Sequence, residues 1–516
     1  MRFRSSAVFS PAIPLIIGAV LRFVHLGGRS LWVDEGLTAM LVSAPIKGTI
    51  AGCAVNSNPP LFYIVLWPWV RLLGVNEFSL ALFSTIAGLV TIYLTYKLAL
   101  YISDHRTAFL ASLIAAFSSF LIYASNDARP YSFLGMAATA AAYFFFRAIN
   151  EDRPLYWILT WVFTAASVYT HLVGWSVVLF EVLYLILAPS VRKGKEARFI
   201  IMTAAVLIIY IPQFFTTLRQ MDIMRVDQIG VESGGLATTM FIALKQFLGG
   251  FYRIMSDYYF MDLQPREFIR QLTSVYSPLF IISLIAGWGI PLFAALFLLK
   301  HRPQWGLFLI LMYLTPFVQV FWEGTDPRRF TPPAPALYII IAMAWFSWNR
   351  GKRLLLALAF FIITAFSLGK TYSMTSSIFK PEDYRQVSHI IRAERGFDDA
   401  VVFYGGSCGC MTWKFYDPGG TIFAAPEFDP HDFSMFAMPP VREILSPQVF
   451  PMTVDSLLEN HSRVWMVISK KTPDTIKLAE AWNRKYNIKI EYTDKYLVLL
   501  NISDLDNRAI KSDKIE

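Results

Sequence analysis

The 516-residue chain has a formal net charge of +9, and 55% of its residues are hydrophobic against 16% charged. A soluble domain has about 25% charged residues, so the composition excludes a purely soluble protein, a disordered chain and a disulfide-stapled secreted domain. A basic balance can also indicate a nucleic-acid partner. Residues 371–516 hold 17 Lys and Arg against 20 Asp and Glu, which leaves 29 against 17 in residues 1–370. The sequence therefore predicts a basic membrane part followed by a slightly acidic tail.

Eleven apolar runs come close to the length that a membrane span needs, about 20 residues for a hydrocarbon core about 30 Å thick. The predicted spans are residues 8–26, 78–101, 107–124, 132–149, 155–170, 172–188, 199–217, 277–299, 306–321, 334–349 and 354–370. We expect the first run to be retained, because no small-residue cleavage site follows it. The predicted fold class is an α-helical polytopic membrane protein with about eleven transmembrane helices.

Lys and Arg gather in every second connection between these spans, as in loops that face the cytoplasm. With a cytoplasmic N-terminus, six short cytoplasmic segments carry Arg2, Arg4, Arg106, Arg147, Arg153, Arg192, Lys193, Lys195, Arg198, Lys300, Arg302, Arg350, Lys352 and Arg353. The short outer turns carry only Arg129, Arg328 and Arg329. The charge thus predicts orientation in a plasma membrane, the inner membrane in a bacterium, and no nucleic-acid partner. Because eleven is an odd number, the tail is expected outside the cytoplasm.

Two outer loops are long. Residues 27–77 contain two predicted helices that lie on the membrane, at 34–44 and 59–73, the second rich in the Trp and Tyr that favour the interface. Residues 218–276 are predicted to form a partly mobile segment. We predict two domains, residues 1–370 in the membrane and an extracytoplasmic α/β domain at 371–516. The tail predicts helices at 381–395 and 473–486 and strands at 400–404, 464–468 and 495–502.

Two adjacent carboxylates, Asp34 and Glu35, follow the first predicted span. A carboxylate at this place can act as a general base that accepts the proton of an attacking hydroxyl. The alternative is a purely structural role, with Asp34 as the N-cap of the helix predicted at 34–44.

The arginines of the outer turns break the positive-inside pattern. Asp127 and Arg129 lie in one turn, and Arg328 and Arg329 lie in another. A guanidinium group can hold a phosphate through two parallel hydrogen bonds. The alternative is that these side chains anchor the turns to lipid headgroups.

Three further features are open to more than one interpretation. His171 stands at an outer tip, where a core or interface role is the alternative to a catalytic one. Glu181 lies inside a predicted span, and a carboxylate there is a functional candidate. Cys408 and Cys410 are too few for a zinc site and form either a tight disulfide or two free thiols.

Five segments, taken in order over about residues 10–350, resemble the GT-C membrane glycosyltransferases, in the bacterial family 39-like branch of protein O-mannosyltransferases and lipid A aminoarabinose transferase. The segments are Arg22-x-x-His25 with Leu31-Trp32-x-Asp34-Glu35, Asn58-Pro59-Pro60-Leu61-x-Tyr63, Tyr123-Ala124-x-x-x-Ala128-Arg129-x-Tyr131-Ser132, Tyr169-Thr170-His171, and Arg329-Phe330 with Pro335. The sequence departs from the family at Ala81, where an Arg is common.

The resemblance implies transfer of a hexose or pentose from a polyprenyl-phosphate donor to a lipid, glycan or protein acceptor on the outer face, with inversion. It implies the following roles: Asp34 as the catalytic base with Glu35 beside it, Arg129, Arg328 and Arg329 at the donor phosphate, and Asp127, His171, Tyr131 and Tyr63 lining the site. Some relatives use a divalent metal, Mg²⁺ or Mn²⁺, although no ligand cluster stands out in the sequence.

A lipid or polysaccharide transporter, or flippase, is the alternative function. A transporter should show paired charges or broken helices inside its spans and often repeated halves. Here the notable charges lie in outer loops, which favours the enzyme. A membrane-anchored protein that binds through its tail would leave eleven spans unexplained.

Overall fold

The structure is a computed structural model of the whole chain. It describes residues 9–24, 26–54, 58–189, 193–229, 292–316, 327–349, 351, 353–354, 357, 368, 383–404, 412–413, 415–416, 422–424, 449–451, 454–469, 482–483, 485–493 and 497–503. Two compact units divide the chain. The helical unit comprises Met1–Leu26, Asn56–Phe62 and Ala81–Ser373, and the mixed unit comprises Gly27–Val55, Tyr63–Leu80 and Met374–Glu516. Most of the first long loop, residues 27–77, is thus grouped with the tail, and Asn56–Phe62 belongs to the helical unit.

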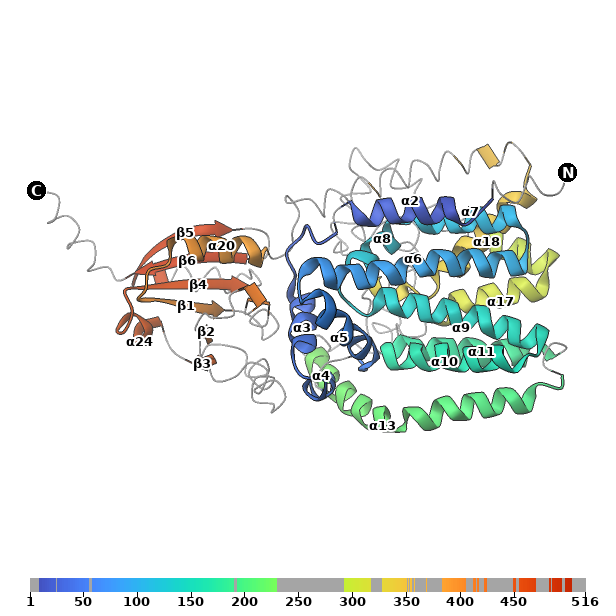
Figure 1. Cartoon of the computed structure of the whole chain (residues 1–516), viewed down its shortest axis with the longest axis horizontal. Helices are drawn as coiled ribbons and strands as arrows, with labels where there is room; N and C mark the ends of the chain where they lie inside the picture. Colours follow the sequence, from blue (N-terminus) through green and yellow to red (C-terminus); the bar gives the residue numbers. More distant parts are fainter. Residues whose placement is uncertain are drawn as a thin grey trace, which may run out of the picture. The chain divides into compact units, whose positions relative to one another are not determined.

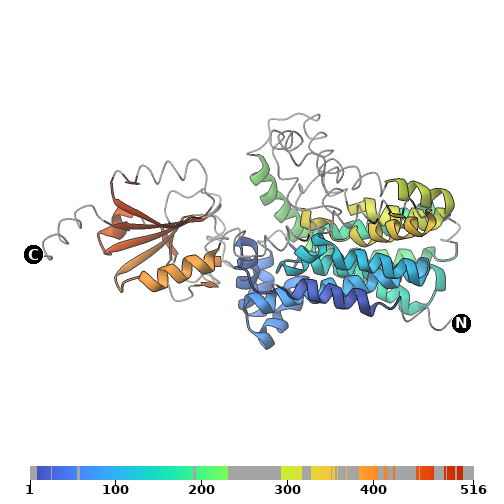
Figure 2. The ribbon, with the colours of Figure 1, turned by 90° about the horizontal axis from the view of Figure 1, so that it is seen from above.

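The helical unit is a bundle of apolar helices. Its labelled helices are α2 (Ala12–Phe23), α6 (Glu77–Ile102), α7 (His105–Phe117), α8 (Ser119–Asn126), α9 (Tyr131–Glu151), α10 (Pro154–Thr170), α11 (Trp175–Leu187), α13 (Glu196–Ile229), α17 (Pro303–Leu314) and α18 (Ala334–Ser347). Helices α6, α9 and α10 run roughly side by side (Figure 1; Figure 2). Helix α10 packs on both α9 and α13, and α7 packs on both α2 and α18.

Among the described residues, three helices are long and apolar enough to cross a membrane, and a bent pair raises this number to four. Shorter apolar helices lie at other predicted spans, including Leu292–His301 within and just beyond the span predicted at 277–299. Large apolar side chains remain exposed on α13, where Ile201 is 69% and Phe215 68% exposed, as expected for a face that contacts lipid. The count of eleven spans stays a prediction, because most of 277–299 and 354–370 lies outside the described residues.

The span predicted at 107–124 is broken. Helices α7 and α8 meet at Ser118 with a bend of 57°. The Ser118 hydroxyl accepts a hydrogen bond from the N–H of Leu121 at 3.2 Å and so caps α8. Since neither Pro nor Gly marks this position, the sequence does not indicate the bend, and the run predicted as one span consists of two helices.

The predicted break at Thr170 and His171 is present: α10 ends at Thr170 and a short 3-10 turn, Leu172–Gly174, leads into α11. Helix α13 extends to Ile229, beyond the span predicted at 199–217. The first part of the segment predicted as a loop at 218–276 is therefore helical, and the remainder lies outside the described residues.

The mixed unit begins with helices in the first long loop. These are α3 (Val33–Ser43), α4 (Ile46–Cys53) and α5 (Leu61–Leu73). Helices α3 and α5 match the two predicted helices, whereas α4 has no predicted counterpart. The indole N–H of Trp67 donates to the Ala44 carbonyl at 2.9 Å, which ties α5 to the connection between α3 and α4.

The tail folds as a six-stranded sheet with the strand order β3-β2-β1-β4-β6-β5. Its elements are α20 (Tyr384–Glu394), β1 (Asp399–Tyr404), β2 (Ile422–Ala424), β3 (Val449–Pro451), α24 (Val454–Leu458), β4 (Arg463–Ser469), β5 (Asn487–Thr493) and β6 (Leu497–Ser503). Strands β3, β2, β1 and β4 are parallel, and β6 lies antiparallel between β4 and β5. The helix predicted at 381–395 and the strands predicted at 400–404, 464–468 and 495–502 are present.

Alternate residues of the central strands build two cores, one on each face of the sheet. Val401, Phe403 and Trp465 pack under α20, which lies along one face (Figure 1). Val402 and Met466 pack with α24 on the other face. The predicted helix at 473–486 falls almost entirely outside the described residues, as do Cys408 and Cys410.

Candidate functional site

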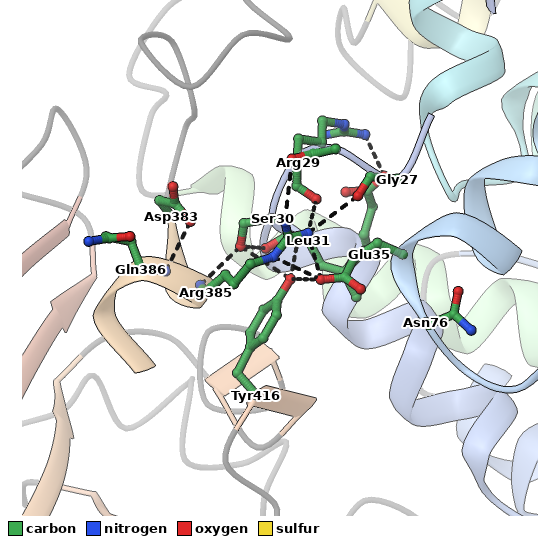
Figure 3. Close-up of polar contacts among 12 residues, drawn as sticks. Gly27, Arg29, Ser30, Leu31, Glu35, Asn76, Asp383, Arg385, Gln386 and Tyr416 are labelled. Atoms are coloured by element: carbon green, nitrogen blue, oxygen red, sulfur yellow. Dashed lines mark hydrogen bonds and ion pairs between the residues drawn. The ribbon is translucent and has the colours of Figure 1, made fainter. Parts of the chain in front are cut away.

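The two carboxylates after the first span lie in the first turn of α3, where the helix dipole favours negative charge. The N-cap of α3 is Trp32, so the alternative role of Asp34 as the N-cap is wrong. Glu35 is buried, and its carboxylate accepts a hydrogen bond from Arg29 Nη2 at 2.5 Å and from the Trp32 N–H at 3.4 Å (Figure 3). Asp34 is partly exposed. The neighbours therefore differ: Glu35 is held as a structural ion pair, and Asp34 is the one with access to solvent.

A second group of predicted residues meets inside the helical unit. Asp127 follows α8 and is fully buried, and Arg328 Nη1 lies 3.4 Å from its Oδ2. The Arg328 guanidinium carbon also lies 4.9 Å from the centre of the Tyr131 ring. Two turns that are 201 residues apart in sequence are thus joined by an ion pair and a cation–π contact.

His171 extends this group. Its ring centre lies 5.7 Å from that of Tyr131. Its Nδ1 accepts a hydrogen bond from the Val173 N–H at 3.2 Å, which assigns the proton of the neutral ring to Nε2. The Thr331 hydroxyl donates to the Tyr131 carbonyl at 2.7 Å and fixes the turn after Arg329 against α9.

The remaining predicted residues are placed as follows. Arg129 is buried, at 4% exposure, in the turn that holds Asp127, and Arg329 is partly exposed next to Arg328. Tyr63 is fully buried in α5 and belongs to the mixed unit. The structure therefore brings Asp127, Tyr131, His171 and Arg328 into contact, and it groups Asp34, Glu35 and Tyr63 in the other unit.

Arg22 positions the turn that carries Asp127, a role that sequence reasoning did not assign. This fully buried side chain donates from Nη1 and Nη2 to the carbonyls of Ala116 and Ala115, at 3.2 and 3.5 Å, where α7 ends. Its Nε donates to the Ser125 hydroxyl at 3.0 Å. The carbonyls freed by the break between α7 and α8 are thereby satisfied. No local pattern signals this role, because the acceptors lie about a hundred residues away.

Asn58 and Glu181 are two further buried polar residues of the helical unit. The side-chain amide of Asn58 is buried and has no hydrogen-bond partner among the described residues. A buried amide of this kind needs a ligand or an ordered water, so Asn58 joins the candidate binding residues. Glu181 accepts a hydrogen bond from the Thr164 hydroxyl at 2.8 Å between α11 and α10, which favours a structural role.

Among the described residues, no group of three or more His, Cys, Asp or Glu side chains can hold a metal ion. The buried Asp127 carboxylate faces an arginine, which is a poor setting for a divalent cation. We therefore assign no metal ligand, and the steps proposed below use side chains of the chain itself.

Sequence comparisons with known proteins match part of the chain. A sequence model of the family described as dolichyl-phosphate-mannose-protein mannosyltransferase matches residues 57–215, less than a third of the chain. An uncharacterized protein of Aquifex aeolicus (strain VF5) is 28% identical over 155 residues, which span 28% of this chain and 30% of that protein.

Solved structures match over far more of the chain. ArnT from Cupriavidus metallidurans bound to undecaprenyl phosphate has a TM-score of 0.60 at 15% identity, with 95% of this chain and 97% of ArnT covered. The Archaeoglobus fulgidus oligosaccharyltransferase AglB, in complex with an inhibitory peptide and a dolichol-phosphate, has a TM-score of 0.56 at 14% identity, with 98% and 75% covered. The chain therefore shares the fold of ArnT and AglB, in agreement with the predicted fold, and its described part contains several apolar helices.

Proposed function

We propose that this protein transfers a sugar from a polyprenyl-phosphate donor to an acceptor hydroxyl on the outer face of the membrane, with inversion at the anomeric carbon. The observation that carries the proposal is the placement of the buried Arg129 and the partly exposed Arg329 in turns of an apolar bundle that has the fold of ArnT. A guanidinium group holds a phosphate through two parallel hydrogen bonds. ArnT has been solved with undecaprenyl phosphate bound, and AglB with a dolichol-phosphate.

In the proposed reaction Asp34 acts as the general base. The acceptor hydroxyl gives its proton to the Asp34 carboxylate, and its oxygen forms a bond to the anomeric carbon. The bond between that carbon and the phosphate oxygen breaks, and its electron pair leaves with the polyprenyl phosphate. Glu35 does not take this role, because Arg29 and the Trp32 N–H already hold its carboxylate.

The arginines stabilise the negative charge that develops on the leaving phosphate. Arg328 shares its charge with Asp127, so we assign it chiefly to fixing the turn. Arg129 and Arg329 are the proposed phosphate ligands, and the Asn58 amide is a further donor. Tyr131, His171 and Tyr63 are proposed to line the site, and the acceptor is a lipid, a glycan or a protein.

Sidedness follows from the basic segments. We propose a cytoplasmic N-terminus and an extracytoplasmic tail in the plasma membrane, because Lys and Arg gather in the predicted cytoplasmic segments and only three arginines lie in the short outer turns. Two of the arginines in these cytoplasmic segments have acidic partners. Arg147 Nε lies 2.7 Å from Glu151 Oε1, and Arg198 pairs with Asp152.

A transporter of lipids or polysaccharides is the second candidate, since α7 and α8 form a broken helix beside the buried Arg22. Arg22, however, donates its hydrogen bonds to the carbonyls of Ala115 and Ala116 and to the Ser125 hydroxyl, which indicates a structural role. A transporter would move a lipid-linked sugar across a vesicle membrane and leave its phosphate bond intact. Product analysis therefore separates the two functions.

The test uses the lipid-linked sugar that accumulates in cells lacking this protein, extracted, radiolabelled and given to the purified full-length chain with acceptor. Asp34→Asn should lower kcat by about 10²- to 10⁴-fold, the usual contribution of a general base, while the protein stays folded and inserted. Asp398→Asn, at a carboxylate that is 63% exposed in the tail, is the matched control and should be fully active. Full transfer by Asp34→Asn would remove the base assignment.

A further inference from the structure

The backbone of residues 27–33, which leads into the helix of Asp34, is held by side chains of the tail within the mixed unit (Figure 3). The Tyr416 hydroxyl accepts a hydrogen bond from the Leu31 N–H at 2.7 Å and one from the Ser30 hydroxyl at 3.2 Å. It donates its own hydrogen to Glu77 Oε1 at 3.1 Å. One phenol thus joins the first long loop to the first residue of α6.

Arg385, from α20, makes the second link. Its Nη2 and Nε lie 2.7 and 3.1 Å from Glu77 Oε1. Nη2 also donates to the Arg29 carbonyl at 2.7 Å and, at 3.4 Å, to the Gly27 carbonyl. A single guanidinium thereby satisfies backbone carbonyls that no helix or strand satisfies, and it neutralises the acid at the start of α6.

Apolar and close backbone contacts add a third link. Val33 packs against the core under α20, and the Thr412 hydroxyl donates to the Val33 carbonyl at 3.3 Å. A Cβ atom added to Gly36 would lie 2.6 Å from the Thr412 Cα, so α3 and the tail approach as closely as glycine permits.

The segment that these contacts hold leads directly into the helical turn of Asp34 and Glu35. The segment from Gly27 to Trp32 has no helix or strand of its own, so its conformation depends on its partners. Its Arg29 side chain holds Glu35, and the preceding residue, Asp34, lies in the same first turn of α3. Burial and the charge of Glu77 raise the pKa of the Tyr416 hydroxyl, so the group keeps its proton at neutral pH and continues to donate.

We propose that Tyr416 and Arg385 are positioning residues for Asp34, and that the tail is therefore a working part of the catalytic machinery rather than only an acceptor-binding attachment. The inference rests on the proposed role of Asp34 as the base. It predicts that small changes in the tail alter the chemical step without altering how tightly the donor is bound.

The first test measures the loop itself and needs no substrate. Hydrogen exchange of the full-length protein in detergent is followed in peptides covering residues 27–35, for the wild type, Tyr416→Phe and Arg385→Gln. Both variants should exchange at least about tenfold faster there, because the Leu31 N–H and the carbonyl contacts lose their partners. Tyr486→Phe is the matched control, since its hydroxyl donates to Asp455 elsewhere in the tail. Unchanged exchange at 27–35 in both variants would overturn the proposal.

The second test measures transfer with the accumulated lipid-linked sugar described above. Tyr416→Phe should lower kcat by about 10- to 100-fold, the usual cost of misplacing a reacting group by about 1 Å, with KM for the donor and the melting temperature preserved. Glu77→Gln keeps an acceptor oxygen for Tyr416 but removes the charge that holds Arg385, and should give a smaller loss. A wild-type kcat in Tyr416→Phe, or a loss confined to KM, would contradict the positioning role.

A double variant separates this inference from the proposed function. If Tyr416 acts through Asp34, Tyr416→Phe in an Asp34→Asn background should cause no further loss. An equal fold-loss in both backgrounds would overturn the inference while leaving Asp34 as the base. Full activity of Asp34→Asn, together with faster exchange at 27–35 in Tyr416→Phe, would instead show that the base assignment is the part that fails.

Discussion

The two compact units use arginines on backbone carbonyls in different ways. In the helical unit Arg22 serves the carbonyls that a helix break leaves open, and it is fully buried. In the mixed unit Arg385 serves the carbonyls of an irregular loop, with 30% of its side chain exposed. The first arrangement fixes a turn inside an apolar bundle, where an unsatisfied group is costly. The second fixes a loop that water can reach, so its loss should alter position and activity more than folding.

Removal of Arg22 should have the largest effect on stability. Arg22→Leu leaves the carbonyls of Ala115 and Ala116 and the Ser125 hydroxyl without this donor, at about 1–3 kcal/mol for each buried unsatisfied group. We expect a loss of at least about 3 kcal/mol, seen as a lower melting temperature and yield in detergent. Arg106→Gln, at an exposed residue of α7, is the control. A stable Arg22→Leu protein would show that the bundle tolerates the open carbonyls and would remove the contrast between the units.

A methyl group at Gly36 should have a smaller effect and act on the other unit. The added Cβ would lie 1.9 Å from the Thr412 Oγ1 and 2.6 Å from its Cα, so α3 must move away from the tail. We expect Gly36→Ala to cost about 2 kcal/mol, as overpacking does, and to lower kcat with little change in KM. Gly48→Ala in α4 is the control, because its nearest neighbour would be the Ala44 Cβ at 3.3 Å. Equal kcat values for the two variants would argue against a close fit between α3 and the tail.

A fall in pH should lower the stability of the tail, because Asp399 becomes protonated. Burial opposes its charge, but hydrogen bonds from Trp465, the Gly396 N–H and Arg463, at 2.8–3.2 Å, outweigh burial and lower the pKa of Asp399. A lowered pKa contributes stability above the unfolded value of about 3.9, and this contribution is lost as the pH falls through the lower folded value. Asp399→Asn should therefore cost about 1.5 kcal/mol at pH 7, and the difference from the wild type should shrink below about pH 4.

Melting temperatures of the full-length protein between pH 7 and pH 3 measure this effect. Asp398→Asn, at the exposed neighbouring carboxylate, should follow the wild type throughout. A constant gap between Asp399→Asn and the wild type across this range would show that the charge of Asp399 contributes nothing to the stability of the sheet.

Much of the fold could be predicted because the controlling signals are local. Apolar runs gave α6, α9 and α10 to within a few residues, and short apolar stretches gave β1, β4 and β6. The break at Ser118 was missed, because a serine in an apolar run carries no turn signal of its own and Arg22 supplies the missing donors from α2. The short strands β2 and β3 were also missed, since three residues are too few to show alternation.

The features of the candidate site also divide into those that the sequence indicated and those that only the structure showed. The sequence by itself indicated the membrane class and the helical runs, and it singled out Asp34 and the arginines of the turns as candidates. The tertiary structure alone decided that Glu35 is held in an ion pair and that Arg328 meets Asp127 across 201 residues. It also decided that Tyr416 reaches the Leu31 N–H across 385 residues. The physical reason is that hydrophobic periodicity is written in neighbouring residues, whereas the partner of a polar group is set by how distant segments pack together.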